Sequence, residues 1–297
     1  MLPNWYEEYK MFIEKSIDIT LDKYITKNNS NSWLEYFRDA IIYATRGWKK
    51  LRAILALEMY LSFSKKQLSE IDFNDDIVQL LVAIECMHAY SLVHDDLPCM
   101  DNDEYRRGQL TTWKKYWEYQ AVLTGDLLNT FCFELLSDIK NKNHAISVLK
   151  ILSQSTGFSG MIWWQISDMY FEENSENLTY SDLLEIHNKK TGALIKASIL
   201  SGIVLANHED EQDEFASFWE KLWLAFQIKD DLLDVEWNFE ETWKSVWWEE
   251  KWFVYFLWLE KTKLELHNLI VYCDNKAKEL QSEKLEFIVQ YIEKRTK

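Results

Sequence analysis

The sequence predicts an all-α fold built as one helical domain. Only two prolines and seven glycines occur among 297 residues, and this scarcity favours long helices over a β architecture rich in turns. With 47% hydrophobic residues, the chain can bury one large core or two modest ones. No repeat, low-complexity segment or linker divides it, so we expect a single domain over residues 1–297.

Apolar residues recur at three- and four-residue spacing along most of the chain, as they do on one face of a helix. This spacing predicts helices over 33–62, 76–97, 115–139, 145–171, 180–206 and 212–236, with further helix in 255–295. Residues 63–75, 98–112, 172–179 and 237–252 are expected to connect them. Pro98 should end the second helix near Leu97, because the residue before a proline avoids the α conformation.

The chain is strongly acidic, with a net charge of −16. Such a surface argues against nucleic-acid binding, because phosphate contacts need clustered basic residues. It also opposes any phosphorylated substrate, unless cations lie between the substrate and the protein.

Membrane and export signals are missing from the sequence as given. No apolar run approaches the roughly 18 residues of a membrane span, so we expect no stable membrane insertion. The first ten residues lack the basic region and apolar run of a signal peptide. The cysteines show no metal-ligand spacing; they are Cys86, Cys99, Cys132 and Cys273. We therefore expect a cytoplasmic protein with reduced cysteines.

Two clusters of aspartates follow apolar helical segments. The first is Asp95-Asp96-Leu97-Pro98-Cys99-Met100-Asp101, and the second is Asp230-Asp231-Leu232-Leu233-Asp234. Because Pro98 breaks the helix of the first cluster, Asp101 must turn back to join Asp95. In the second cluster, spacings of three and four residues place the carboxylates along one face of a helix.

Carboxylates held this close repel one another unless a cation or water lies between them. About one residue in six is acidic, so either cluster could belong to a solvated surface. Their position at the ends of apolar helices favours metal binding, since uncompensated carboxylates are least tolerated there. Ligands made only of oxygen indicate a hard cation, and Mg²⁺ commonly takes one or two carboxylates together with water and phosphate.

Basic residues that could complete a diphosphate site occur in three segments. They are Lys49 and Arg52 in RGWKKLR, Arg106 and Arg107 after the first cluster, and Lys190 beside Thr191 in KKTGALI. Arginine offers a planar fork to phosphate oxygens, and lysine offers a point charge. Each alone is more typical of a solvated side chain, but their combination indicates diphosphate binding.

Four sequence blocks stand in the order of a known family: ECMHAYSLVHDDLPCMDNDEYRRGQLT, GDLLNTFCFELL, KTGALIKAS and AFQIKDDLLDV. Through them the chain resembles the trans-prenyl diphosphate synthases, in particular the bacterial farnesyl diphosphate synthases and their geranylgeranyl relatives. The resemblance covers about residues 35–265. It implies a single α-helical bundle around a deep central cavity, usually in a homodimer.

The resemblance also implies roles for individual residues. Mg²⁺, as three ions with bound diphosphate, would be held by Asp95, Asp96 and Asp101 on one side and by Asp230, Asp231 and Asp234 on the other. Isopentenyl diphosphate would be bound by Lys49, Arg52, His88 and Arg107. The allylic diphosphate would be bound by Arg106, Lys190, Thr191, Gln227 and Lys244, of which Lys190, Thr191 and Gln227 are the catalytic candidates.

The implied reaction joins isopentenyl diphosphate to dimethylallyl or geranyl diphosphate. Metal and cationic side chains stabilise the leaving diphosphate, and the double bond of isopentenyl diphosphate attacks the resulting allylic cation. Tyr90 precedes Asp95 by five residues, roughly 7 Å along a helix, and should form a floor that stops growth at farnesyl diphosphate. Ser91 is too small to do so. Geranylgeranyl diphosphate is the alternative product, because LPCMDND also occurs in those relatives.

Three other functions compete with chain elongation. A class I terpene cyclase mixes Asn, Ser or Thr with Glu in its second metal motif, where this chain has DDLLD. A di-iron bundle needs Glu-x-x-His on two helices, and only Glu85-x-x-His88 occurs. A non-catalytic partner subunit of a heteromeric synthase is expected to lose one aspartate cluster, and both are intact.

Tryptophan is unusually frequent. The chain has fifteen tryptophans and seven glycines, whereas glycine alone usually makes up about 7% of a protein. Where the family has glycine, this chain has Trp48, Trp117, Trp163, Trp164, Trp223, Trp243 and Trp258. A tryptophan-rich natural variant is one interpretation. Because a single replacement recurs so consistently, we favour UGA codons that mean glycine and have been read as tryptophan. Trp113 is expected to be genuine, and Trp5, Trp33 and Trp219 stay undecided.

Overall fold

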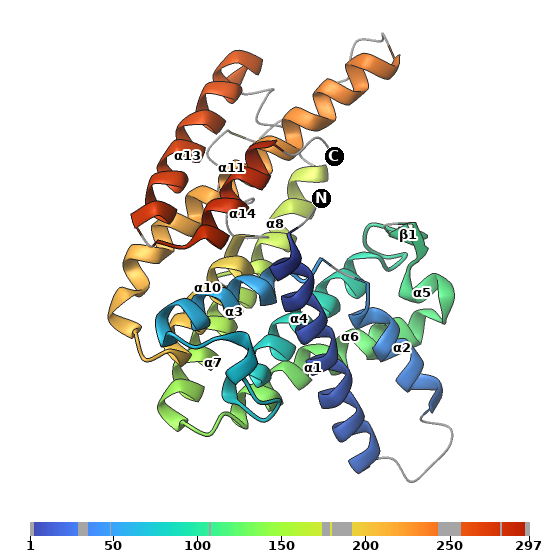
Figure 1. The fold of residues 1–297 in the computed structure, drawn as a ribbon. Helices are drawn as coiled ribbons and strands as arrows, with labels where there is room; N and C mark the ends of the chain where they lie inside the picture. Colours follow the sequence, from blue (N-terminus) through green and yellow to red (C-terminus); the bar gives the residue numbers. More distant parts are fainter. Residues whose placement is uncertain are drawn as a thin grey trace. The chain divides into compact units, whose positions relative to one another are not determined.

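The structure, a computed structural model, describes residues 3–28, 35–47, 49–106, 108–173, 179, 192–242, 257–279 and 281–294. These residues are almost entirely helical (Figure 1), and their only strands are two of two residues each. The predicted all-α class is therefore confirmed. The chain falls into two compact units, Met1–Ile151 with Ser201–His208, and Leu152–Leu200 with Glu209–Lys297. A single domain around a central cavity stays a prediction.

The first unit is built around one central helix, α4. Its elements are α1 (Asn4–Asn28), α2 (Glu35–Thr45), α3 (Leu51–Ser64), η2 (Leu68–Glu70), α4 (Asp76–Asp95), β1 (Tyr105–Arg106), β2 (Gln109–Leu110), α5 (Thr112–Lys115), α6 (Glu118–Ser137) and the start of α7 (Lys142–Thr156). Helix α4 packs against α1, α2, α3 and α6, and Figure 1 shows the dark blue α1 lying against it. Its apolar side chains, among them Leu80, Leu81 and Ile84, are completely buried.

Helix α4 departs from the expectation that no segment of this chain is long and apolar enough to span a membrane. Its best 18-residue window has a mean hydropathy of 1.4, so its length and composition suffice to cross a membrane. However, 72% of that window is buried inside the protein. A helix packed on several sides by other helices is hydrophobic all round for that reason, and α4 is therefore a core helix.

Helices α4 and α6 approach each other closely at Gly125. A Cβ atom on this residue would lie 2.1 Å from Nε2 of His94, far inside any tolerated contact. The missing side chain lets Nε2 of His94 donate to the carbonyl oxygen of Val122 at 3.0 Å. The glycine of the GDLL block is thus required by packing.

Two predicted helices are each interrupted. The one expected over 33–62 divides into α2 and α3, because Gly47 and Lys50 have φ values of 79° and 55° in the left-handed region. The one expected over 145–171 divides into α7 and α8 between Gly157 and Gly160. Apolar spacing continues across both breaks, so it could not reveal them.

The second unit is organised by its longest helix, α11. Its elements are α8 (Met161–Glu173), the larger part of α10 (Gly192–Leu205), η4 (Glu209–Glu211), α11 (Gln212–Thr242), α13 (Leu259–Glu279) and α14 (Glu283–Lys294). Helices α13 and α14 pack on α11 and on each other. Helix α11 continues past its predicted end at residue 236, so the second aspartate cluster lies within a helix rather than at its end.

The backbone at Trp258 has a conformation typical of glycine. Its φ is 66°, in the left-handed region that bulky residues rarely adopt, and its side chain is 77% exposed. Glycine enters this region at no steric cost. This geometry supports our interpretation that position 258 is glycine in the native protein.

The other tryptophans at family glycine positions differ in side-chain exposure and packing. Trp117 is 62% exposed. Trp163 and Trp164 lie in the first turn of α8 rather than in a helix interior as expected, and Trp163 is exposed. Trp223 is buried and stacks on Phe226 with ring centroids 5.2 Å apart, so it is well packed. Trp48 and Trp243 lie outside the described residues.

Trp113 and Trp219 differ in their hydrogen bonding. Nε1 of Trp113 donates to the carbonyl oxygen of Asp103 at 2.9 Å, as expected of a genuine tryptophan. Trp219 is buried, and its Nε1 has no hydrogen-bond partner in the part of the chain that the structure describes. A buried donor without a partner costs about 1–3 kcal/mol, so tryptophan is unfavourable at position 219.

Candidate functional site

The first aspartate cluster lies at the end of α4. Asp95 is the last residue of the helix and Asp96 caps it. The chain then turns back, and the backbone N–H of Asp101 donates to the carbonyl oxygen of Asp95 at 2.9 Å. The predicted end of the helix before Pro98 and the predicted return of Asp101 are both confirmed.

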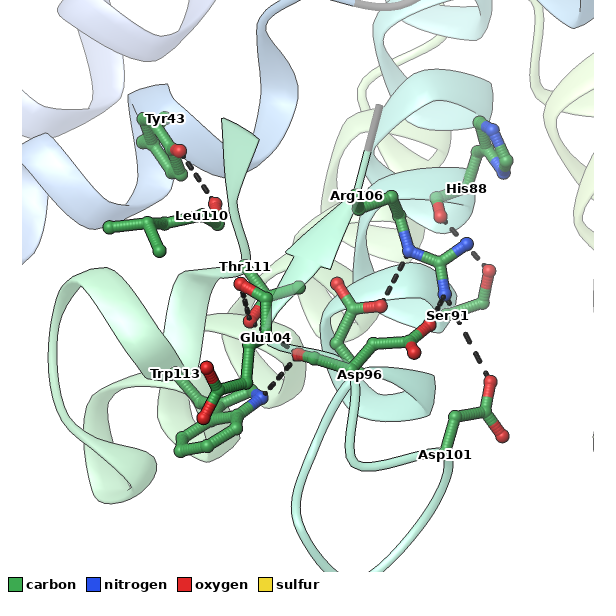
Figure 2. A network of polar contacts seen from close by, with 11 residues as sticks. Tyr43, His88, Ser91, Asp96, Asp101, Glu104, Arg106, Leu110, Thr111 and Trp113 are labelled. Carbon is green, nitrogen blue, oxygen red and sulfur yellow. Dashed lines mark hydrogen bonds and ion pairs between the residues drawn. The ribbon is translucent and has the colours of Figure 1, made fainter. Parts of the chain in front are cut away.

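One arginine lies among these aspartates. Figure 2 shows Arg106 between Asp96 and Asp101. Its Nε donates to Oδ1 of Asp96 at 2.5 Å, and its Nη2 lies 3.3 Å from Oδ2 of Asp103 and 4.0 Å from Oδ2 of Asp101. Burial raises the pKa of the Asp96 carboxyl, and the Arg106 guanidinium opposes that rise. Arg106 therefore supplies positive charge to the cluster.

The pairing with Arg106 also affects how the carboxylates are arranged. Within the described ranges, no three His, Cys, Asp or Glu side chains lie close enough to hold a metal ion. Asp96 is turned toward Arg106, whereas the side chain of Asp101 is about half exposed. The cluster thus contains the predicted carboxylates without bringing three of them to one point.

A short hairpin positions Arg106. Strand β1 pairs with β2 in antiparallel register, with Arg106 opposite Gln109. The hydroxyl of Tyr43, on α2, donates to the carbonyl oxygen of Leu110 at 2.6 Å (Figure 2). The hydroxyl of Thr111 donates to the carbonyl oxygen of Asp103 at 2.7 Å. These contacts join the hairpin to α2 and to the loop after α4.

A pocket lies beside the Asp96–Arg106 pair. Both residues line it, together with Tyr43, Arg46 and Leu92, so its wall combines apolar surface with charges of both signs. All of its lining residues come from the first unit. Asp96 and Arg106 therefore face a space that a small polar ligand could enter.

The residues expected to bind isopentenyl diphosphate also lie in the first unit. Nη1 of Arg52, on α3, donates to Nε2 of His88, on α4, at 3.2 Å. Lys49 is exposed, and its carbonyl oxygen accepts a hydrogen bond from the hydroxyl of Tyr6 at 2.6 Å. The structure thus brings Arg52 and His88 together, and Arg107 lies outside the described residues.

The second aspartate cluster lies on α11. Gln227, Asp230 and Asp231 are half-buried there. Asp230 and Asp231 follow Gln227 by three and four residues, which places all three on one side of the helix. The helical spacing predicted for this cluster is confirmed. The side chains of Asp234, Lys190, Thr191 and Lys244 lie outside the described residues.

The two candidates for product length are neighbours on α4. Tyr90 is buried, and its ring packs edge-on against His94 with centroids 5.8 Å apart. Burial raises its pKa, so the phenol stays neutral. The hydroxyl of Ser91 donates to the carbonyl oxygen of His88 at 2.9 Å. The role of Tyr90 as a floor stays a prediction.

Several residues of the site were not predicted from the sequence. Asp103 pairs with Arg106, Tyr6 holds the Lys49 carbonyl, and Lys50 pairs with Glu85. Only the Asp103–Arg106 pair could have been anticipated, because its two residues are opposite in charge and three residues apart in DNDEYR. The other two contacts join segments far apart in the chain, which no local pattern reveals.

The chain is similar to known proteins over most of its length. The sequence profile of the polyprenyl synthetase family matches residues 34–248, which include both aspartate clusters. A farnesyl diphosphate synthase of Micrococcus luteus is 37% identical over 268 residues, 87% of this chain and 89% of the relative. A geranylgeranyl diphosphate synthase of Cyanophora paradoxa is 35% identical over 236 residues, 77% of this chain and 74% of the relative. The apo crystal structure of an FPP/GFPP synthase from Zymomonas mobilis superimposes with a TM-score of 0.81 at 28% identity, covering 97% of this chain and 98% of that one.

Proposed function

Because the chain belongs to the polyprenyl synthetase family, we propose that it condenses isopentenyl diphosphate with dimethylallyl or geranyl diphosphate to give farnesyl diphosphate. Farnesyl diphosphate synthases of three bacteria, 37%, 36% and 33% identical to it, support this product. The geranylgeranyl diphosphate synthase of Cyanophora paradoxa supports the alternative product. The observation that carries the proposal is the group of aspartates around Arg106 at the end of α4. A product assay in the presence of Mg²⁺ tests it.

The donor set of the aspartate clusters fits Mg²⁺. It consists of carboxylate oxygens alone, which suit a hard cation that keeps waters and binds substrate phosphate. The residues that would hold the metal are Asp95, Asp96, Asp101, Asp230, Asp231 and Asp234. When bound, Mg²⁺ supplies charge neutralisation for the leaving diphosphate.

The basic side chains orient the two substrates. Arg106, Lys190, Thr191, Gln227 and Lys244 hold the allylic diphosphate, while Lys49, Arg52, His88 and Arg107 hold isopentenyl diphosphate. Fixing both diphosphates brings the double bond of one substrate to the reacting carbon of the other, which converts a bimolecular encounter into a positioned reaction. A carbon–carbon bond forms, and the proton that is lost passes to the released diphosphate.

We also propose that the protein is a homodimer and that α6 contributes to the interface. Four apolar side chains of this helix are exposed at helical spacing: Tyr119, Val122, Leu123 and Leu127. A contiguous exposed apolar patch is typical of an interaction surface. Its position on a helix that packs on the core helix α4 gives a partner copy a rigid surface to bind.

Charges placed on this surface should separate the dimer. The double variant Leu123→Asp/Leu127→Asp should elute as a monomer in size-exclusion chromatography with light scattering, because a buried unpaired carboxylate is costly. Ile146→Asp, on the exposed surface of α7, should leave the dimer unchanged. A parent protein that is monomeric at micromolar concentration would rule out the dimer.

The product length should depend on Tyr90. Tyr90→Ala removes a buried ring from α4, so the growing chain should extend past C15, and gas chromatography of the dephosphorylated products should show longer prenyl alcohols. Ser91→Ala, one residue along the same helix, should leave the product unchanged. An identical product distribution in Tyr90→Ala would place the floor elsewhere.

The expected compartment is the cytoplasm. All four cysteines are free, and three of them are buried. Burial raises the pKa of the Cys86 thiol to about 12, so it remains protonated. Free thiols are typical of proteins kept in a reducing compartment.

A further inference from the structure

An ion pair is buried beneath the segment that joins α2 to α3. Nζ of Lys50 lies 3.3 Å from Oε2 of Glu85, and the two side chains are 0% and 2% exposed. Nζ also donates to the carbonyl oxygen of Thr45, the last residue of α2, at 2.5 Å. Because an unpaired charge is strongly disfavoured at such depth, the ammonium holds the end of α2 against α4.

The same ion pair fixes the start of α3. Oε1 of Glu85 accepts a hydrogen bond from the backbone N–H of Ala53 at 3.4 Å, and this N–H has no partner within the helix. The carbonyl oxygen of Lys50 accepts from the N–H of Ile54 at 2.8 Å. Lys50 also has a φ of 55°, a left-handed conformation that persists in a lysine only when its surroundings enforce it.

The residues on either side of Lys50 are the ones proposed to bind isopentenyl diphosphate. The hydroxyl of Tyr6, a buried residue of α1, donates to the carbonyl oxygen of Lys49 at 2.6 Å. Arg52 donates to His88, which lies three residues after Glu85 on α4 and so on the same side of that helix. Contacts from α1 and α4 therefore hold the backbone that carries Lys49 and Arg52.

We infer that Lys50, Glu85 and Tyr6 are positioning residues for the isopentenyl diphosphate site. They hold Lys49, Lys50 and the start of α3 in place before substrate arrives, so ordering this backbone costs no binding free energy. The inference rests on the proposed function of Lys49, Arg52 and His88. Lys49 would bind the substrate, whereas its neighbour Lys50 would hold the backbone in place.

Steady-state kinetics test this role, in the full chain with glycine at the seven family glycine positions that now carry tryptophan. Glu85→Gln keeps the size of the side chain and removes its charge, and Tyr6→Phe removes one hydroxyl. Both should raise the KM for isopentenyl diphosphate, by about tenfold for Glu85→Gln. The KM for geranyl diphosphate and the kcat at saturating isopentenyl diphosphate should stay within about twofold. Tyr9→Phe is the matched control, because it removes a buried hydrogen bond to Glu58 that also joins α1 to α3 but lies away from this segment.

A second variant separates positioning from folding. Loss of one partner of a buried ion pair can unfold a protein, whereas apolar replacement of both partners is often neutral. Lys50→Met/Glu85→Met should therefore keep the thermal unfolding temperature of the parent. It should also show the raised KM for isopentenyl diphosphate and faster hydrogen exchange at residues 46–53.

Two results would overturn the inference. One is a folded double variant with an unchanged KM for isopentenyl diphosphate, and the other is an equal rise in both KM values. A folded parent of this glycine form that makes no prenyl product would contradict the proposed function instead. Hydrogen exchange at residues 46–53 would then decide separately whether the buried pair orders this segment.

Discussion

Replacing tryptophan with glycine at positions 48, 117, 163, 164, 223, 243 and 258 should convert a poorly folding, weakly active chain into a soluble and active one. An indole placed where the backbone has room for hydrogen alone overpacks the site, at a cost of about 1–3 kcal/mol each. Several sites of that kind together are comparable with the ~5–15 kcal/mol stability of an ordinary domain.

The structure supports this expectation most strongly at position 258. Trp258 combines a positive φ with an exposed indole, so glycine there relieves strain and removes an apolar surface at once. Trp117 and Trp163 also expose their rings, and exposed aromatic surface promotes aggregation. Trp223 is the exception, because its buried ring stacks on Phe226 and the case for glycine there rests on the family resemblance.

Synthetic genes for the two forms allow a direct comparison of soluble yield, thermal unfolding and turnover. Adding Trp113→Gly to the form with seven glycines is the control. It should lower stability, because Trp113 donates a hydrogen bond to Asp103. Tryptophan masses in native peptides that span positions 48 and 163 would refute the interpretation, as would UGG codons at these positions in the gene.

Asp95→Ala or Asp230→Ala should lower kcat by about 10²–10³-fold or more while the fold survives. Each substitution removes a carboxylate proposed to hold Mg²⁺, and charge neutralisation of the leaving diphosphate depends on that metal. Both residues lie on helices, α4 and α11, that are packed through many buried apolar side chains. Circular dichroism should therefore show parent-like helix content in both variants.

Two surface aspartates serve as controls, one in each unit. Asp22 pairs with Arg38 at 3.0 Å, and Asp274 pairs with Lys278 at 2.5 Å. Exposed ion pairs of this kind contribute about 0–1 kcal/mol, so their alanine variants should keep parental turnover. Chelation with EDTA should abolish activity in the parent, and added Mg²⁺ should restore it. Retention of most activity in Asp95→Ala or Asp230→Ala would contradict the metal assignment.

The predictions that the structure confirms rest on residues close to one another in the sequence. The end of α4 follows from Pro98, which excludes the α conformation from the residue before it. The return of Asp101 to the Asp95 carbonyl follows from the same break. The helical spacing of the second aspartate cluster on α11 follows from its sequence and needs no knowledge of the tertiary structure.

Two features that the sequence did not predict, the break between α2 and α3 and the hairpin before α5, depend on contacts between distant segments. The break between α2 and α3 is enforced by Glu85, 35 residues after Lys50, and by Tyr6 on α1. Nothing in RGWKKLR shows that one lysine is buried and the other exposed. The small hairpin at residues 105–110 lies within an expected connection, and Tyr43 of α2 holds it in place.

Within the site, the contacts of Arg106 likewise could not be predicted from the sequence. The resemblance assigned it to the allylic diphosphate, and the structure pairs it with Asp96. The guanidinium fork suits carboxylate and phosphate oxygens alike, so the pairing with Asp96 is compatible with a role at a diphosphate. Family motifs therefore supplied the candidate residues of the site, while their mutual contacts had to come from the structure.

The most direct test of prenyl transfer is a product assay with isopentenyl diphosphate and, in turn, dimethylallyl, geranyl and farnesyl diphosphate. With Mg²⁺ present, the C5 and C10 partners should be converted to farnesyl diphosphate, and the C15 partner should be extended slowly or not at all. Efficient extension of the C15 partner would identify the geranylgeranyl alternative. No condensation with any of the three partners, in a folded chain that carries both aspartate clusters, would contradict the proposed function.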